Sequence, residues 1–185
     1  MDNLLPINSK DDILEEWRNT PIGLLLEFHN LNRPFEPIDT AQLLVGMCMD
    51  NRKYLNIPDN FAFIIRSGGA SLKYSEFKVS YAIAVGRVSY IALIGHNNCG
   101  MVNLISRKNE FIDGLVSSAG WEKERALEQF MNFAPMFEIG NSVSFILSET
   151  KRLRLCYPKI KIAPLYYLVE DNKLYLINEK EGNTI

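Results

Sequence analysis

The stretch that decides the fold is an apolar run followed by a histidine and a cysteine: Tyr90-Ile91-Ala92-Leu93-Ile94-Gly95-His96-Asn97-Asn98-Cys99-Gly100. A short continuous apolar run of this kind is typical of a strand that is buried on both faces of a parallel sheet. His96 and Cys99 follow the run directly. Ligands of open parallel sheets bind at the carboxyl ends of the strands, so we expect both side chains at that edge.

A second cysteine motif follows another apolar run earlier in the chain. Residues 41–47 have the pattern of a buried strand, and Cys48-Met49-Asp50-Asn51-Arg52 comes next. Each motif alone has an ordinary explanation, because a buried cysteine at a strand end is most often a small core residue. Together they place Cys48, His96 and Cys99 at one sheet edge. Two thiolates and one imidazole suit Zn²⁺ and leave a fourth position for water or substrate, which predicts a catalytic zinc centre.

The rest of the chain predicts one α/β domain. After a turn at 57–60 we expect a second strand at 61–65 and a crossover helix at 71–85, whose apolar face would comprise Phe77, Tyr81, Ala84 and Val85. Helical segments should follow from 101 to 131 and from 141 to 156, and two strands at 160–169 and 173–177 should close the chain. A strand, a helix and a strand in this order indicate a right-handed parallel crossover.

The first 40 residues predict an N-terminal helical arm ahead of a core at 41–185. Ser9 has the features of a helix cap, and Pro21 should end the helix. Its apolar face would comprise Ile13, Leu14 and Trp17. This arm and the apolar stretch 22–28 could pack on their own subunit, as single amphipathic helices usually do. We favour the alternative that they reach across the two-fold axis of a homodimer.

Composition narrows the class of protein. The chain has 185 residues, 47% hydrophobic and 23% charged, with a formal net charge of −2. This charge offers no basic footprint for nucleic acid. No signal peptide is visible, and no apolar stretch approaches the roughly 20 residues of a membrane span, so we expect no membrane partner. Three cysteines, two of them in ligand-like positions, indicate a reducing compartment and predict a cytoplasmic protein.

The combined motifs resemble those of the β-class carbonic anhydrases of the compact prokaryotic type. The resemblance rests on Cys-x-Asp-x-Arg at 48–52, on Arg66 with its small-residue loop, and on Gly-His-x-x-Cys-Gly at 95–100; it extends from about residue 43 to 177. It implies a central, mostly parallel β-sheet flanked by helices. It also implies zinc ligation by Cys48, His96 and Cys99, reversible hydration of CO2 to bicarbonate, and an active-site cleft at a dimer interface.

The resemblance makes Asp50 and Arg52 a catalytic dyad. In that family the aspartate either occupies the fourth zinc position or pairs with the arginine and leaves this position to water. The chemistry agrees, because a zinc-bound hydroxide attacking CO2 gains from an ionised carboxylate that accepts its hydrogen bond. Arg52 can keep that carboxylate ionised through a bidentate pair. The alternative is a surface ion pair of little energetic value.

The chain departs from the family pattern at three places. Arg66-Ser67-Gly68-Gly69 stands where Arg-Asn-Ala-Gly is usual, and we interpret Ser67, Gly68 and Gly69 as the close-packed wall of the zinc cleft. Residues 24–35 contain no counterpart of the family's glutamine, and the final core strand carries Pro164 near a usual glycine. These departures concern specificity and rate more than metal binding.

Two further hypotheses remain open from sequence. The chain could hydrolyse CO2-like molecules such as carbonyl sulfide or carbon disulfide, or it could be a non-catalytic zinc protein in which Asp50 stays on the metal. His29 is expected in a polar turn at the surface, and Cys156 on a helix face without a ligand partner. With no other histidine than His29 and His96, protons should leave through solvent or buffer.

Overall fold

The computed structural model describes residues 3–179, whose centre is a six-stranded sheet. The strand order is β1-β6-β5-β4-β2-β3. Four strands run parallel: β2 (Leu43–Cys48), β3 (Ala62–Ser67), β4 (Tyr90–His96) and β5 (Lys161–Leu168). β6 (Lys173–Ile177) is antiparallel to β5, and the short β1 (Leu4–Leu5) is antiparallel to β6. The mostly parallel α/β sheet expected from the sequence is therefore confirmed.

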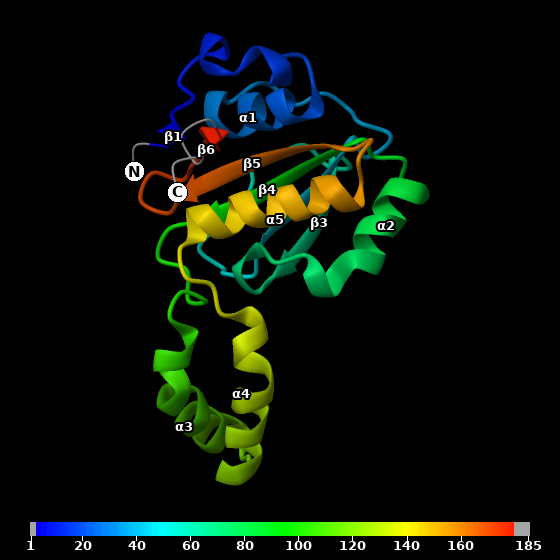
Figure 1. Ribbon diagram of the computed structural model, residues 1–185. Coiled ribbons are helices and arrows are strands. Elements are labelled where there is room, and N and C mark those ends of the chain that lie inside the picture. The colour runs from blue at the N-terminus through cyan, green and yellow to red at the C-terminus, as the bar shows by residue number, and fades with distance from the viewer. Residues whose placement is uncertain (1–2, 180–185) are drawn as a thin grey trace.

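Helices cover both faces of this sheet (Figure 1). The helix α1 (Pro21–Leu31) packs with Val45, Met47, Ala92 and Ile94 on one face. The helices α2 (Glu76–Ala84) and α5 (Ser142–Cys156) pack on the other, where alternate strand residues such as Leu44, Ile91 and Leu93 point. Each fully buried Leu or Ile contributes about 1.5–3 kcal/mol relative to exposure. Burial on both faces explains why these strands read as continuous apolar runs.

A helical hairpin leaves the sheet at its carboxyl edge. After β4 the chain forms a short 3₁₀ turn, η5 (Leu104–Arg107), then α3 (Lys108–Ala119) and α4 (Lys123–Phe137), and returns through α5 to β5. Gly120, at a φ of +68°, ends α3 in the left-handed region that favours glycine. The hairpin projects away from the sheet (Figure 1). Its two ends are joined at the base, where the amide of Ile139 donates to the carbonyl of Met101.

The prediction of an α-helix that ends at Pro21 is wrong. Two 3₁₀ turns, η1 (Lys10–Asp12) and η2 (Glu15–Trp17), occupy the segment, and α1 starts at Pro21 instead of the earlier helix ending there. Thr20 caps α1 by accepting a hydrogen bond from the amide of Gly23. Proline at the first helical position has no amide to leave unsatisfied and already has a helical φ, which makes it a start signal.

Most of the predicted apolar face of this arm packs on its own chain. Ile13, Trp17, Ile22, Leu25 and Leu26 are all at most 5% exposed within the single chain. They pack in one cluster with the face of the sheet that α1 covers. The arm therefore packs largely on its own subunit, although Leu14 and Phe35 stay 39% and 50% exposed. Its reach across a two-fold axis stays a prediction.

The apolar face predicted for the crossover helix points to solvent. In α2 the side chains of Phe77 and Tyr81 are 82% and 51% exposed, and Val85, which caps the helix, is 61% exposed. Val79 and Ala82 are buried against the sheet. Two 3₁₀ turns, η3 (Gly68–Ala70) and η4 (Lys73–Ser75), precede the helix and set its rotation. Phe63 on the outer strand β3 is 36% exposed. Within residues 3–179 no helix is both long and apolar enough to span a bilayer.

A pair of Gly→Ala variants tests the packing of the N-terminal segment. A Cβ at Gly23 would lie 2.4 Å from the backbone oxygen of Trp17, which cannot move aside without shifting η2. Gly23→Ala should therefore lower the free energy of unfolding by about 1–3 kcal/mol. Gly114→Ala, in α3 with no atom within 4 Å, should raise it by about 0.5–1 kcal/mol. Urea unfolding followed by circular dichroism measures both; an unaltered Gly23→Ala midpoint would contradict this packing.

Candidate metal centre

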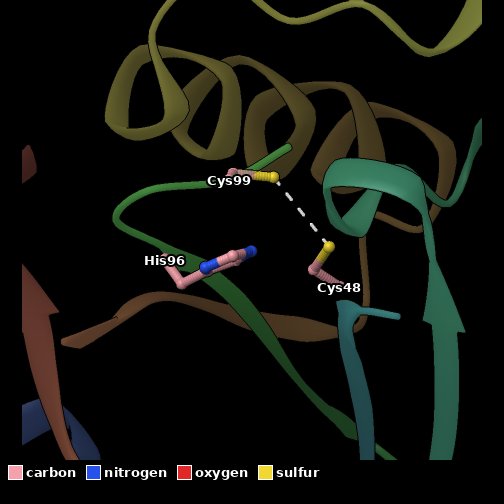
Figure 2. Close-up of side chains that lie close together, drawn as sticks. All are labelled: Cys48, His96 and Cys99. Atoms are coloured by element: carbon pink, nitrogen blue, oxygen red, sulfur yellow. Dashed lines mark hydrogen bonds between the residues drawn. The ribbon is translucent and has the colours of Figure 1, made fainter. Parts of the chain in front are cut away.

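The side chains of Cys48, His96 and Cys99 converge at the carboxyl edge of the sheet. Cys48 is the last residue of β2, His96 is the last of β4, and Cys99 lies in the turn that follows. Their three ligand atoms lie within 4.8 Å of one another, and all three residues are buried. Figure 2 shows the three side chains pointing toward one another. The parallel register produces this convergence, since Met47 of β2 pairs with Ile94 of β4 and brings the two strand ends level.

The imidazole of His96 is oriented as a metal ligand. Its Nδ1 lies 2.7 Å from the carbonyl oxygen of Asn97. A carbonyl can only accept, so Nδ1 carries the hydrogen and Nε2 keeps a free lone pair. Nε2 is buried and has no hydrogen-bond partner among the described residues. A buried acceptor without a partner is costly, and a bound cation would satisfy it. The residues present therefore fit a metal ion.

The two thiols give the same indication. Their sulfurs are 3.9 Å apart. The hydrogen bond from Cys99 is the main cause that lowers the pKa of Cys48; burial opposes it, and His96 and the backbone amides of Asp50 and Gly69 add to the lowering. The pKa of Cys99 is raised, chiefly by its interaction with Cys48 and then by burial. A second thiolate at this distance thus requires a cation between the sulfurs.

Asp50 lies beside the centre and is paired with Arg52. The Arg52 guanidinium donates from Nε to Asp50 Oδ1 (3.0 Å) and from an Nη to Oδ2 (2.6 Å), and the Arg52 amide also donates to Oδ1 (2.9 Å). Arg52 is the principal cause that holds the pKa of Asp50 well below its ordinary value. Asp50 Oδ2 is 4.0 Å from His96 Nε2. The carboxylate is therefore ionised, turned toward Arg52, and within reach of the ligand cluster.

Two arginines tie the loops around the centre together. Arg52 also donates to the carbonyl of Asn98, at 2.8 Å, in the turn between His96 and Cys99. Arg66 donates to the carbonyls of Cys48 (3.3 Å) and Lys53 (3.0 Å). Arg52 thus links the two ligand loops, and Arg66 fixes the loop 48–53 to β3, which the planar set of guanidinium donors allows. The ligand-bearing loops are thus held in place before any metal binds.

Lys53 is a residue of this centre that the sequence analysis missed. Its side chain is 0% exposed, and its ammonium lies 3.3 Å from the Asp50 carbonyl and 3.7 Å from Asp50 Oδ1. Burial lowers its pKa, while the negative charges of Cys48, Asp50 and Cys99 oppose that effect. Its position directly after the Cys-x-Asp-x-Arg motif was the only signal in the sequence. A lysine leaving a strand is ordinarily solvated, so its burial could not be inferred.

The Ser67–Gly69 loop passes between the centre and the helical hairpin. The backbone amide of Gly69 is directed at the Cys48 sulfur, and the φ of +61° at Gly69 suits glycine. A Cβ on Gly68 would lie 3.1 Å from the sulfur of Met101. Ser67 directs its hydroxyl at the carbonyl of Ser71 (2.6 Å). The glycines thus let the backbone lie close to both the thiol and the hairpin, as a cleft wall requires; the assignment as cleft wall stays a prediction.

An apolar cavity of about 630 Å³ adjoins this loop. The hairpin supplies most of its lining, and Met49 and Gly68, neighbours of the ligand Cys48 and of Gly69, supply the side nearest the centre. Its main aromatic lining residues are Phe111, Trp121, Phe130, Phe133 and Phe137. A cavity with so few polar groups takes small, neutral, apolar molecules more readily than ions. This cavity could not be predicted from the sequence, because its lining residues are far apart in the chain and meet only when α3 and α4 pack together.

The remaining histidine and cysteine lie away from the centre. His29, expected in a surface turn, is in α1 and only 8% exposed; its Nδ1 accepts the amide hydrogen of Asn56 at 3.0 Å. The prediction for His29 was wrong because α1 continues to Leu31 and packs on the sheet. Cys156 is exposed near the end of α5, as predicted.

Comparison with known proteins shows similarity in structure but not in sequence. No protein-family model matches the chain, and no curated protein matches it significantly. A carbonic anhydrase from Glaciozyma antarctica superimposes with a TM-score of 0.59 at 18% identity, over 75% of this chain and 83% of that one.

Two further solved structures give the same result. The β-carbonic anhydrase isoform I from Trichomonas vaginalis has a TM-score of 0.59 at 19% identity, over 80% of this chain and 90% of that one. A carbon disulfide hydrolase in its apo form has a TM-score of 0.51 at 19% identity, over 79% and 84%. Similarity at this level of identity establishes the fold, and the chain therefore has the α/β fold of the β-carbonic anhydrases, as its motifs implied.

Proposed function

We propose that this protein is a zinc-dependent carbonic anhydrase, which interconverts CO2 and bicarbonate. The observation that carries the proposal is the convergence of Cys48, His96 and Cys99 within 4.8 Å, beside an Asp50 carboxylate that is turned toward Arg52. Two sulfurs and one nitrogen form a ligand set that zinc prefers, and three protein ligands leave one position free. The shared fold with carbonic anhydrases of known structure supports the same conclusion.

The spacing of the sulfurs supports zinc as the metal. Zn–S bonds of about 2.3 Å meeting at a tetrahedral angle hold two sulfurs roughly 3.8 Å apart. The observed separation is 3.9 Å, so Cys48 and Cys99 need almost no movement to bind. When bound, zinc supplies the Lewis acidity that makes water nucleophilic near neutral pH.

Residues of the chain supply orientation and access. Asp50, kept ionised by Arg52, is a hydrogen-bond acceptor placed to orient a nucleophilic water beside the centre. The apolar cavity next to Met49 and Gly68 provides a route for CO2, which is small and neutral. Neither histidine is placed for a proton shuttle, since His96 is a proposed ligand and His29 is buried in α1. Protons would leave through solvent or buffer.

The apolar cavity also favours a second candidate substrate class. Carbonyl sulfide and carbon disulfide are linear like CO2 but more apolar, and a cavity lined by Phe111, Phe130 and Phe133 accommodates them. One solved structure with this fold is a carbon disulfide hydrolase. Turnover of CO2, carbonyl sulfide and carbon disulfide by one preparation discriminates the two activities. A kcat/KM for CO2 below that for either sulfur compound would replace the first candidate by the second.

We also propose a homodimer in the cytoplasm. The outer strand β3 and the helix α2 expose five large apolar side chains: Phe63, Ile64, Phe77, Tyr81 and Val85. An outer strand has a free hydrogen-bonding edge, which a second copy can pair with across a two-fold axis. The N-terminal segment offers less apolar surface for an interface, because most of its apolar side chains are already buried. Three free thiols support a reducing compartment.

Cysteine variants test the metal assignment. Cys48→Ser and Cys99→Ser should each lose zinc and CO2 hydration, because a serine hydroxyl is not ionised near neutral pH and binds zinc poorly. Cys156→Ser is the matched control, since Cys156 is exposed and distant from the centre; it should keep about one zinc per chain. Metal analysis and stopped-flow CO2 hydration on the same samples give both readouts. Full zinc occupancy in Cys99→Ser would remove Cys99 from the ligand set.

Variants of the dyad test the role of Asp50. Asp50→Ala should keep zinc but lose about 10–100-fold in kcat/KM for CO2, because the orienting acceptor is lost while the ligands remain. Arg52→Ala should act in the same direction, since an unpaired Asp50 can approach the metal. Arg154→Ala, which breaks an ion pair with Glu179 near the start of β5, is the control and should retain activity. Unchanged rates in both dyad variants would show that the pair is structural only.

Light scattering tests the dimer. The wild-type zinc form should have the mass of two chains at micromolar concentration. Ile64→Lys combined with Phe77→Lys should give a monomer, because charges on an apolar interface must be desolvated when it forms. Leu155→Lys, at a side chain 77% exposed on α5, should leave the dimer intact. A wild-type monomer would contradict the proposed assembly and leave the zinc chemistry unaffected.

A further inference from the structure

We infer that Lys53 is a positioning residue that holds Asp50 in its outward, Arg52-paired orientation and so keeps the fourth position of the metal open. The inference rests on the proposed function, since it concerns the state of the same centre. It adds to the Asp50–Arg52 pair a third member, a buried cation whose side chain is 0% exposed.

The polar contacts of the Lys53 ammonium are with Asp50. Within residues 3–179 the Lys53 ammonium makes one hydrogen bond, to the Asp50 carbonyl at 3.3 Å, and one ion pair, to Asp50 Oδ1 at 3.7 Å. Arg52 donates to the same Oδ1 from its own Nε and amide. Two cations thus converge on Oδ1, while Oδ2 lies 4.0 Å from His96 Nε2. The outward orientation is stabilised from two sides.

Arg52, the bidentate partner of Asp50, is partly exposed. Its side chain is 45% exposed, so water and salt compete with its ion pair. Lys53 is shielded from solvent, and its attraction for the carboxylate is screened much less. The metal would attract the same carboxylate from the other side, across the gap between Oδ2 and the ligand cluster. The buried ammonium therefore shifts the balance between the outward and the metal-bound orientation toward the outward one.

Stability does not account for a lysine at this position. A buried ammonium with a single long hydrogen bond is costly, and an apolar side chain of similar length fills the same space without desolvation of a charge. The charged groups that face Lys53 are Asp50, the thiols of Cys48 and Cys99, and the Arg66 guanidinium, which opposes its charge. The carboxylate and the two metal-binding thiols are the groups that can carry negative charge there. The positive charge of Lys53 therefore suits the charge of the site, whereas an apolar side chain would fill the same space equally well.

Cobalt substitution with azide titration tests the inference. Cobalt(II) can replace zinc as a visible-absorbing ion, and azide changes its spectrum only where a position is open to it. The wild-type cobalt protein should respond to azide. Lys53→Met should raise the apparent Kd for azide about tenfold or more, because Asp50 then competes for the fourth position. Lys53→Gln serves as a second neutral variant, Lys53→Arg should restore much of the response, and Lys151→Met, at an exposed lysine of α5, should match the wild type.

An Asp50→Ala background separates positioning from other roles. If Lys53 acts through Asp50, adding Lys53→Met to Asp50→Ala should change the azide Kd less than twofold. A tenfold loss that persists without Asp50 would overturn the inference, as would an unchanged Kd in both Lys53→Met and Lys53→Gln with full cobalt content. The titration needs no turnover, so it decides the role of Lys53 even if the protein does not hydrate CO2. If the wild type hydrates CO2 and the Lys53 variants keep the wild-type azide Kd, this inference fails and the proposed function stands.

Discussion

The site depends on one electrostatic constraint. Two thiols with sulfurs 3.9 Å apart share a buried space with an imidazole nitrogen that has no hydrogen-bond partner within residues 3–179. Both sulfurs cannot be ionised there without a cation, and the nitrogen is costly without one. The sheet enforces this arrangement, because β2 and β4 are parallel and end level with each other. Apolar residues that bury both faces of these strands therefore position the ligands although none of them touches a metal.

Three cationic side chains surround the proposed ligands, and they have different partners. Arg66 and Arg52 bind backbone carbonyls of the two ligand loops, so they fix geometry. Arg52 and Lys53 bind the Asp50 side chain, so they set its orientation. A centre in which two thiolates neutralise a divalent metal has little charge left to attract an anionic nucleophile or product. The nearby cations restore positive charge around the centre. Lys53 does so from a position shielded from solvent, whereas Arg52 is partly exposed.

Much of this centre was predictable because its signals are local. Cys48, His96 and Cys99 each follow a strand directly, and Asp50 and Arg52 are close enough in sequence for their pairing to follow from the motif. What the sequence could not give depends on how elements rotate and pack. The α2 pattern was compatible with two helix faces, and the turns before it selected the one bearing Val79 and Ala82. Pro21 could end a helix or start one, and only the Thr20 cap decides between them. The burial of Lys53 depends on loops that Arg66 draws inward.

The metal centre and the apolar cavity are mechanically connected. Cys48 and Cys99 pack in a small cluster with Ile139, and Met101, Val102 and Phe145 cover it. Met101 and Ile139 are the two ends of the α3–α4 hairpin, joined by a backbone hydrogen bond. Because this cluster contains few apolar residues, a metal held by the two cysteines, as proposed, would add to its stability. Such a metal would fasten the base of the hairpin, which supplies the aromatic lining of the cavity. The ligand cluster and the cavity share Met101, so a change at one is expected to be felt at the other.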